Sequence, residues 1–267
     1  MRPLLTRLFT PTYIAMASSS SPSSFASPSR RLAHLTRHLL LSSSSPGDLS
    51  SVGAPAADAA SAAAAAPARP AAPKGYAAVL VCLFEDPHGD PRVLLTKRAA
   101  SLSSHSGEVS LPGGKVEEGD ADVKATALRE AQEEIGLDPA LVSVVTVLEP
   151  FLSKNGLHVT PVIGILSDKD LFKPVLNKSE VEDIFDAPLE MFLKDDNRKI
   201  REVNWMGVNI PVQFFEHQSE GKTFVIWGLT AHILTRAVAV VLQREPSFVE
   251  LPRPNYTSPP FSDTNEK

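Results

Sequence analysis

The chain has 267 residues, enough for one large domain or two small ones. It carries 26 basic and 31 acidic residues, a net charge of −5 with neutral histidines. Residues 1–50 contain five Arg and one Asp, so the remainder has 21 basic and 30 acidic residues and a net charge of −9. This acidic balance argues against a general nucleic-acid binder, which must neutralise phosphates. It does not exclude a nucleotide-like substrate whose phosphates are screened by metal.

The N-terminal segment, residues 1–50, is rich in Ser and Arg and has no Asp or Glu before Asp48. This composition is typical of mitochondrial and chloroplast transit peptides. Within it, residues 32–41 can form a short amphipathic helix. We therefore expect a transit peptide, with the mitochondrion favoured and the chloroplast as the alternative; a merely disordered Ser-rich tail is the other interpretation. Residues 51–73 are mostly Ala and Pro, which predicts a linker.

Two strands are expected next, at 76–85 and 92–98, joined by a turn-rich loop. The first strand is an apolar run that contains the single cysteine, Cys82. We interpret Cys82 as a core residue, because a reactive thiol needs an electropositive neighbourhood. A single cysteine forms no intramolecular disulfide, as expected in a reducing compartment. Residues 99–120 are expected to form a loop.

A helix is expected from about 121 to 135. Its buried stripe is apolar: Val123, Ala127, Leu128, Ala131 and Ile135. Glu130, Glu133 and Glu134 share another face, because each helical residue advances about 100°. Like charges at i and i+4 destabilise a helix, and a divalent metal held by oxygen ligands could offset that cost. A merely solvated acidic face is the alternative.

The residues around this helix support a defined structure. Arg129 precedes Glu133 by four positions, so the two side chains can pair and fix a rotamer. Gly136 permits the left-handed conformation that ends many helices. Asp120 and Asp122 suit the first helical turn, beside the positive end of the helix dipole.

The rest of the chain predicts a mixed α/β fold, with a folded domain over 74–246 and a loose tail over 247–267. The expected elements are strands at 142–148 and 158–166, a short helix at 189–193, a hairpin of 210–215 and 223–226, and a C-terminal helix at 228–243. The apolar window 224–242 contains His232 and Arg236, and such residues are costly inside a membrane. We therefore expect a core strand and a buried helix there, not a membrane span.

Residues 114–137 resemble the Nudix box, which reads Gly, five residues, Glu, seven residues, Arg-Glu, an apolar residue, any residue, Glu-Glu, any residue, Gly and an apolar residue. The second half matches in register from Arg129 onward. In the first half, the spacing from Gly to Arg is 15 positions where the common pattern has 14. Ala121 stands where the first Glu is usual, so Asp120 and Asp122 are the candidates to replace it.

An upstream signature resembles that of the coenzyme A diphosphatases, a branch of the Nudix family, here of the plant organellar type. The signature reads Leu-Leu-Thr, any residue, Arg, Ser or Ala, three residues, Arg, three residues, Gly, three residues, Phe-Pro-Gly-Gly. Residues 94–114 keep every spacing, but Ser103 replaces the second Arg and Leu111 replaces Phe. Leu for Phe is a packing change, whereas loss of the Arg removes a cation from the expected substrate side.

The resemblance implies the Nudix α/β/α sandwich, a mixed sheet between helices. It also implies hydrolysis of the diphosphate of coenzyme A or its thioesters, giving 4′-phosphopantetheine and adenosine 3′,5′-bisphosphate, with Mg²⁺ or Mn²⁺ as cofactor. The expected partner is this small-molecule substrate, not nucleic acid. An ADP-ribose or NADH diphosphatase is the alternative with the same chemistry. A catalytically silent module that binds nucleotides or a partner is the alternative from another class.

The expected metal ligands are the carboxylates of the box helix: Glu130, Glu133 and Glu134. The expected catalytic group is Glu133, Glu134 and Arg129. In the family, a box glutamate or a carboxylate from a distal loop can act as base, and Glu180 and Glu182 are candidates for the distal one.

The expected substrate-binding residues precede the box helix. Gly113 and Gly114 let the backbone approach the phosphates closely, and Arg98 could contact a substrate phosphate. A surface strand arginine with no such role is the alternative for Arg98.

Overall fold

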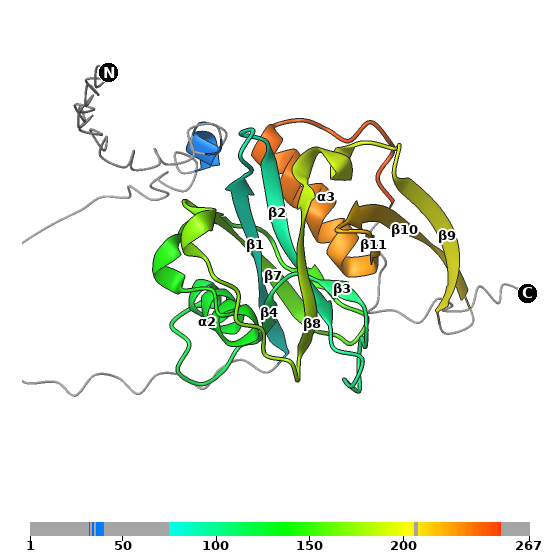
Figure 1. The fold of residues 1–267 in the computed structure, drawn as a ribbon. Coiled ribbons are helices and arrows are strands. Elements are labelled where there is room, and N and C mark those ends of the chain that lie inside the picture. Colours follow the sequence, from blue (N-terminus) through cyan, green and yellow to red (C-terminus); the bar gives the residue numbers. More distant parts are fainter. Residues whose placement is uncertain (1–31, 33, 35, 40–74, 206–207, 252–267) are drawn as a thin grey trace, which may run out of the picture.

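The computed structural model describes residues 32, 34, 36–39, 75–205 and 208–251 (Figure 1). The expected linker at 51–73, most of the expected transit peptide and most of the expected C-terminal tail lie outside these residues. The predicted boundaries of those segments therefore stay predictions.

A mixed sheet of eight strands forms the centre of the described fold. Its strands are β1 (Tyr76–Glu85), β2 (Pro91–Arg98), β3 (Val109–Ser110), β4 (Gly113–Lys115), β5 (Val142–Val147), β6 (Phe151–Leu152), β7 (His158–Leu166) and β8 (Val181–Pro188). The β1 strand pairs in parallel with β7 and antiparallel with β2 and β4. A strand in this central position is buried on both faces, which explains its continuous apolar sequence.

Helices cover the two faces of the sheet (Figure 1). The helix α2 (Val123–Ile135) packs on the face to which β1 turns Ala78, Leu80 and Cys82. The helix α3 (Gly228–Leu242) shares a second core with the opposite face of β1. Neighbouring residues of β1 enter different cores because successive side chains of a strand point to opposite faces. The architecture is the expected α/β sandwich with a mixed sheet.

A second sheet of three antiparallel strands, in the order β11-β10-β9, lies beside α3 (Figure 1). Its strands are β9 (Arg198–Trp205), β10 (Val208–Ser219) and β11 (Lys222–Trp227). The β10 and β11 strands confirm the predicted hairpin and extend it. Sequence patterns missed β8 and β9, whose many charged residues conceal the strand alternation. Three short 3₁₀ helices complete the described elements: η1 (Pro139–Leu141), η2 (Lys169–Leu171) and η3 (Leu189–Leu193).

The ends of α2 follow from its capping residues. Asp122 is the N-cap, and its side chain accepts hydrogen bonds from the backbone N–H groups of Lys124 and Ala125. Gly136 ends the helix in the left-handed conformation, with φ of 71°. The predicted C-cap is confirmed, and the helix begins at residue 123, not 121, because Asp122 is its cap.

The expected strand and helix at 224–242 are core elements. The side chains of Phe224 and Ile226 from β11, and of Ile233, Leu234 and Val238 from α3, are all buried. Within the described ranges, no helix has both the length and the apolar content that a membrane crossing requires.

Candidate active site

The Gly113–Gly114 turn lies against the middle of the main sheet. Gly113 pairs with Val79 of β1, and a Cβ atom at Gly113 would lie 2.3 Å from the carbonyl oxygen of Ala78. A Cβ atom at Gly114 would lie 2.3 Å from Oε1 of Glu130. Real Cβ atoms essentially never come so close to another heavy atom. Both positions therefore need glycine, the first for the approach of β1 and the second for a carboxylate.

Glu134 is the most buried acidic residue of the box helix, with 3% of its side chain exposed. Its Oε2 accepts a hydrogen bond from the backbone N–H of Gly113 at 3.2 Å, and Oε1 lies 3.8 Å from the Arg98 guanidinium. Burial raises the pKa of Glu134 to about 7, although Gly113 and Arg98 act in the opposite direction. The Gly113–Gly114 turn thus holds Glu134 in place, and few neighbouring groups compensate its negative charge.

Glu130 lies beside Glu134 and faces Gly114. Its side chain is 14% exposed, and burial raises its pKa above the usual value. The guanidinium of Arg129 lowers that pKa in part, since Nη1 donates to Oε1 of Glu130 at 3.1 Å. The structure therefore brings Glu130, Glu134 and the two glycines together, as the sequence predicts.

Arg129 connects four groups around the site. It forms a two-point ion pair with Asp120, with Nε–Oδ1 at 2.9 Å and Nη2–Oδ2 at 3.0 Å. Its Nη1 donates to both Glu130 and Glu133 at 3.1 Å, and its Nη2 donates to the carbonyl of Lys115 at 3.1 Å. This pairing holds the pKa of Asp120 well below its usual range. Arg129 therefore positions carboxylates, and its own donors are largely used.

The two candidates for the first box carboxylate have different roles. Asp120 pairs with Arg129, whereas Asp122 caps α2. Asp120 is further held by the backbone N–H of Glu117 and the hydroxyl of Thr126. Of the two candidates, Asp120 is therefore the one whose carboxylate is joined to the acidic residues of the box helix through Arg129.

Glu133 lies apart from the other two predicted metal ligands. Its side chain is 57% exposed, and its partner in the structure is Arg129. Among the described residues, no three or more His, Cys, Asp or Glu side chains are grouped so that they could hold a metal ion. Glu133 is instead on the exposed side of the helix, where its carboxylate lies 3.1 Å from Nη1 of Arg129. The assignment of these residues as metal ligands stays a prediction.

The two distal candidates for the base point to different sides of the sheet. Glu180 lies near the box helix, where its negative charge adds to the rise in the pKa of Glu134. Its carbonyl accepts a hydrogen bond from the Ala99 N–H at 2.8 Å, which ties this loop to the end of β2. Glu182 forms an ion pair with Lys97 at 2.7 Å. Lys97 borders the hollow beside β11, on the face opposite α2, so Glu182 is remote from Glu134.

The guanidinium of Arg98 has hydrogen-bond donors that are not used within the described residues. Its Nη1 lies 3.8 Å from Glu134, beyond hydrogen-bond distance. Its Nε is buried and has no hydrogen-bond partner in the described part of the chain. A buried donor without a partner is costly, and an anion bound beside Glu134 would satisfy it.

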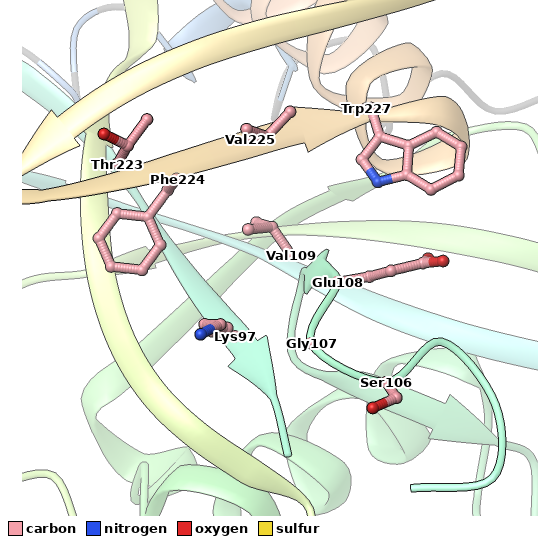
Figure 2. A pocket seen from close by; sticks show the side chains of 9 residues that line it. All are labelled: Lys97, Ser106, Gly107, Glu108, Val109, Thr223, Phe224, Val225 and Trp227. Carbon is pink, nitrogen blue, oxygen red and sulfur yellow. The ribbon is translucent and has the colours of Figure 1, made fainter. Parts of the chain in front are cut away.

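A hollow of about 220 Å³ lies beside the loop that leads into the catalytic turn. One wall is residues 106–109, and the other is residues 223–227 of β11 (Figure 2). Trp227, whose ring stacks on Phe214 with centroids 5.4 Å apart, gives the hollow an aromatic side. Sequence reasoning missed this hollow because its walls are more than 100 residues apart in the chain.

Comparison with known proteins agrees with this geometry. The NUDIX domain profile matches residues 75–227, more than half of the chain. The chain belongs to the Nudix family. Nudix hydrolase 15, mitochondrial, from Arabidopsis thaliana is 62% identical over 174 residues, which are 65% of this chain and 61% of that protein. Nudix hydrolase 22, chloroplastic, from the same organism is 60% identical over 174 residues, 65% of this chain and 58% of that protein.

The match to these two relatives thus covers about three fifths of their length. A more distant relative is the peroxisomal coenzyme A diphosphatase NUDT7 of Mus musculus. It is 35% identical over 158 residues, which are 58% of this chain and 66% of that protein.

The loop between the glycine turn and the box helix is held by Arg129. Its Nη2 donates to the carbonyl of Lys115 and to the carboxylate of Asp120, which joins the two ends of the segment 115–120. Gly119 within it has φ of 110°, a conformation that favours glycine. In the sequence, the additional residue of this box lies between Gly114 and Arg129, and the pattern from Arg129 onward is unchanged.

Proposed function

We propose that this protein hydrolyses the diphosphate of coenzyme A or its thioesters, releasing 4′-phosphopantetheine and adenosine 3′,5′-bisphosphate. The observation that carries the proposal is the pair of carboxylates, Glu134 buried and Glu130 partly buried, that face a glycine turn with the Arg98 donors beside them. The signature spacing of residues 94–114 and the similarity to a coenzyme A diphosphatase support the substrate.

The donor set fits Mg²⁺ or Mn²⁺, since hard cations prefer carboxylate oxygens together with substrate phosphates. Glu130, Glu133 and Glu134 are the residues proposed to hold the ion. Burial raises the pKa values of Glu130 and Glu134, and a bound cation would offset that cost of keeping the two carboxylates charged. When bound, such an ion screens the diphosphate charge and lowers the pKa of a bound water.

The protein's own groups would then orient the reaction. The free donor of Arg98 would bind a phosphate oxygen, which holds the diphosphate beside Glu134, and Gly113 and Gly114 would let the diphosphate approach the backbone closely. Glu180 would accept the proton of the attacking water, because its carboxylate lies on the Glu134 side of the sheet. The oxygen of that water forms the new P–O bond, the bridging P–O bond breaks, and the leaving phosphate takes the electron pair. Arg129 and Asp120 would keep Glu130 and Glu133 in position.

An organellar location belongs to the same proposal. Two relatives at 60% and 62% identity are named chloroplastic and mitochondrial. The Arg-rich, acid-poor N-terminal sequence is typical of such targeting. We favour the mitochondrion, and a fluorescent protein fused behind residues 1–73 tests this: a diffuse cytosolic signal would refute organellar targeting.

The deciding experiment is product analysis by mass spectrometry. The purified full chain is given coenzyme A, ADP-ribose and NADH separately, with Mg²⁺ or Mn²⁺. We expect the highest kcat/KM with coenzyme A and the two products named above. Equal or better efficiency with ADP-ribose or NADH would favour the alternative diphosphatase.

A catalytic control accompanies the panel. Glu134→Gln should fold normally and lower turnover by about 100-fold or more, the scale for losing a charged group that stabilises a transition state. The exposed Glu118→Gln should leave turnover unchanged. No activity with any substrate would favour the silent module. Unchanged turnover in Glu134→Gln at saturating metal would contradict the catalytic role of Glu134.

A further inference from the structure

A helix from the N-terminal segment packs on the folded domain. The described residues 32, 34 and 36–39 are helical, and Figure 1 shows them as the blue helix near the top of the sheet. Leu32 and Thr36 are 0% exposed and Leu39 is 7% exposed, whereas His34 and Arg37 are exposed. The buried positions are spaced by four and three residues, so they lie on one helix face. One face is therefore in contact with the domain and the other faces solvent.

Specific hydrogen bonds accompany this packing. The backbone N–H of Leu32 donates to Oε1 of Glu85 at 2.5 Å, at the C-terminal end of β1. The ring Nε2 of His38 lies 3.0 Å from the carbonyl oxygen of Val240, near the end of α3. A carboxylate beside the first turn satisfies a free helical N–H and interacts favourably with the helix dipole. Contacts to two separate elements fix both position and direction of the helix.

The two leucines belong to the main hydrophobic core. Leu32 and Leu39 are in the same buried cluster as Leu83 of β1 and Val241 of α3. Removing them would expose part of that core to water, which is unfavourable in proportion to the apolar area exposed. A helix that is discarded after import would leave such a surface on the mature protein.

We infer that this N-terminal helix, described at residues 32, 34 and 36–39, is a structural part of the mature protein, and that any targeting peptide is removed before Leu32. The composition of the sequence alone places that boundary near residue 50. The inference does not depend on which substrate is hydrolysed. Glu85 is at the opposite end of β1 from Ala78 and Val79, which pair with the catalytic glycines. The helix therefore supports the fold without touching the Glu130–Glu134 site.

The first test is the thermal stability of the full chain. Leu32→Ala combined with Leu39→Ala should lower the unfolding midpoint by about 10 °C or more, since each substitution leaves a cavity in the core that costs about 2–5 kcal/mol. The control variant, His34→Ala combined with Arg37→Ala, changes exposed positions of the same helix. It should shift the unfolding midpoint by less than about 1 °C. At a temperature where both variants are folded, kcat/KM should be unchanged. Equal midpoints for the two pairs would overturn the inference.

The second test locates the processing site directly. It shows whether the mature protein keeps the helix even if the leucine variant does not fold. The mature protein is recovered from the organelle that imports it, and its N-terminal residue is identified by sequencing. We expect a chain that begins at or before Leu32. A chain that begins after Leu32 would overturn the inference.

Discussion

Replacing Gly114 with Ala would test whether the position of the Glu130 carboxylate controls the reaction. Gly114 is not in a left-handed conformation, so Ala fits the backbone, but its Cβ atom would lie 2.3 Å from Oε1 of Glu130. Ordinary contact begins at 3.4 Å, so the carboxylate must move by about 1.1 Å. A misplacement of about 1 Å can cost about 100-fold in rate, which is about 2.7 kcal/mol in the barrier.

The fold should tolerate the change, because the contacted atoms are the flexible end of a side chain. We expect the free energy of unfolding to change by less than about 1 kcal/mol, within the usual range for a substitution that leaves core and backbone intact. The assay is turnover of coenzyme A at saturating Mg²⁺, with thermal unfolding measured on the same samples. Lys115→Ala, which truncates an exposed neighbouring side chain, is the matched control.

A second substitution tests whether the effect of Gly114→Ala arises from its contact with Glu130. Glu130→Asp shortens the side chain by one methylene and withdraws its carboxylate from position 114. Combined with Gly114→Ala, it should cost much less than the product of the two single effects, since both act on one contact. Wild-type turnover in Gly114→Ala, or strictly multiplicative losses, would show that this contact does not position a reacting group.

Three further outcomes are expected. Glu180→Gln should lower turnover by about 100-fold or more, the scale of general base catalysis, whereas Glu182→Gln should not; equal losses would contradict the assignment of the base. Asp120→Asn should lower the free energy of unfolding by about 2 kcal/mol at pH 7, because Arg129 depresses the pKa of Asp120. A depressed pKa stabilises the folded state above the ordinary value of 3.8, so the difference in unfolding midpoint should shrink as the pH falls below about 4. Ser103→Arg should lower the KM for coenzyme A by about 10-fold or more if the new cation gains a charge-assisted contact of about 1.5–3 kcal/mol; an unchanged KM would show that this loop position does not meet a phosphate.

Helices and strands with a strong apolar pattern in their own sequence could be predicted. The apolar run of β1, the amphipathic α2 and the long α3 carry their periodicity within one segment, and all three are confirmed within two residues at each end. The two-residue β3 and the three-residue β4 were expected as loop. Such short strands exist because a neighbouring strand offers hydrogen-bond partners, which no local pattern reveals.

In the candidate site, too, features set by local spacing could be predicted, whereas contacts with distant segments could not. Helical spacing placed Glu130 and Glu134 on one face of the helix, but it could not show that Gly113 and Gly114 pack against their carboxylates. It also could not show that Arg129 pairs with Glu133 while it is held by Lys115 and Asp120, because those two residues lie in a loop 9 to 14 residues upstream of Arg129. It also could not separate the role of Asp120 from that of Asp122, because both are compatible with a helix start.

The buried thiol of Cys82 allows opening of the main sheet to be measured by thiol labelling. Cys82 is 0% exposed in the centre of β1, and burial raises the pKa of its thiol to about 12. Thiol reagents need a thiolate that they can reach, so they should react only when β1 separates from its neighbours. Since the chain has one cysteine, the rate of labelling would report opening of the sheet at one defined position, without any engineered probe. The same shielding would keep oxidants away from the thiol for as long as the sheet stays closed.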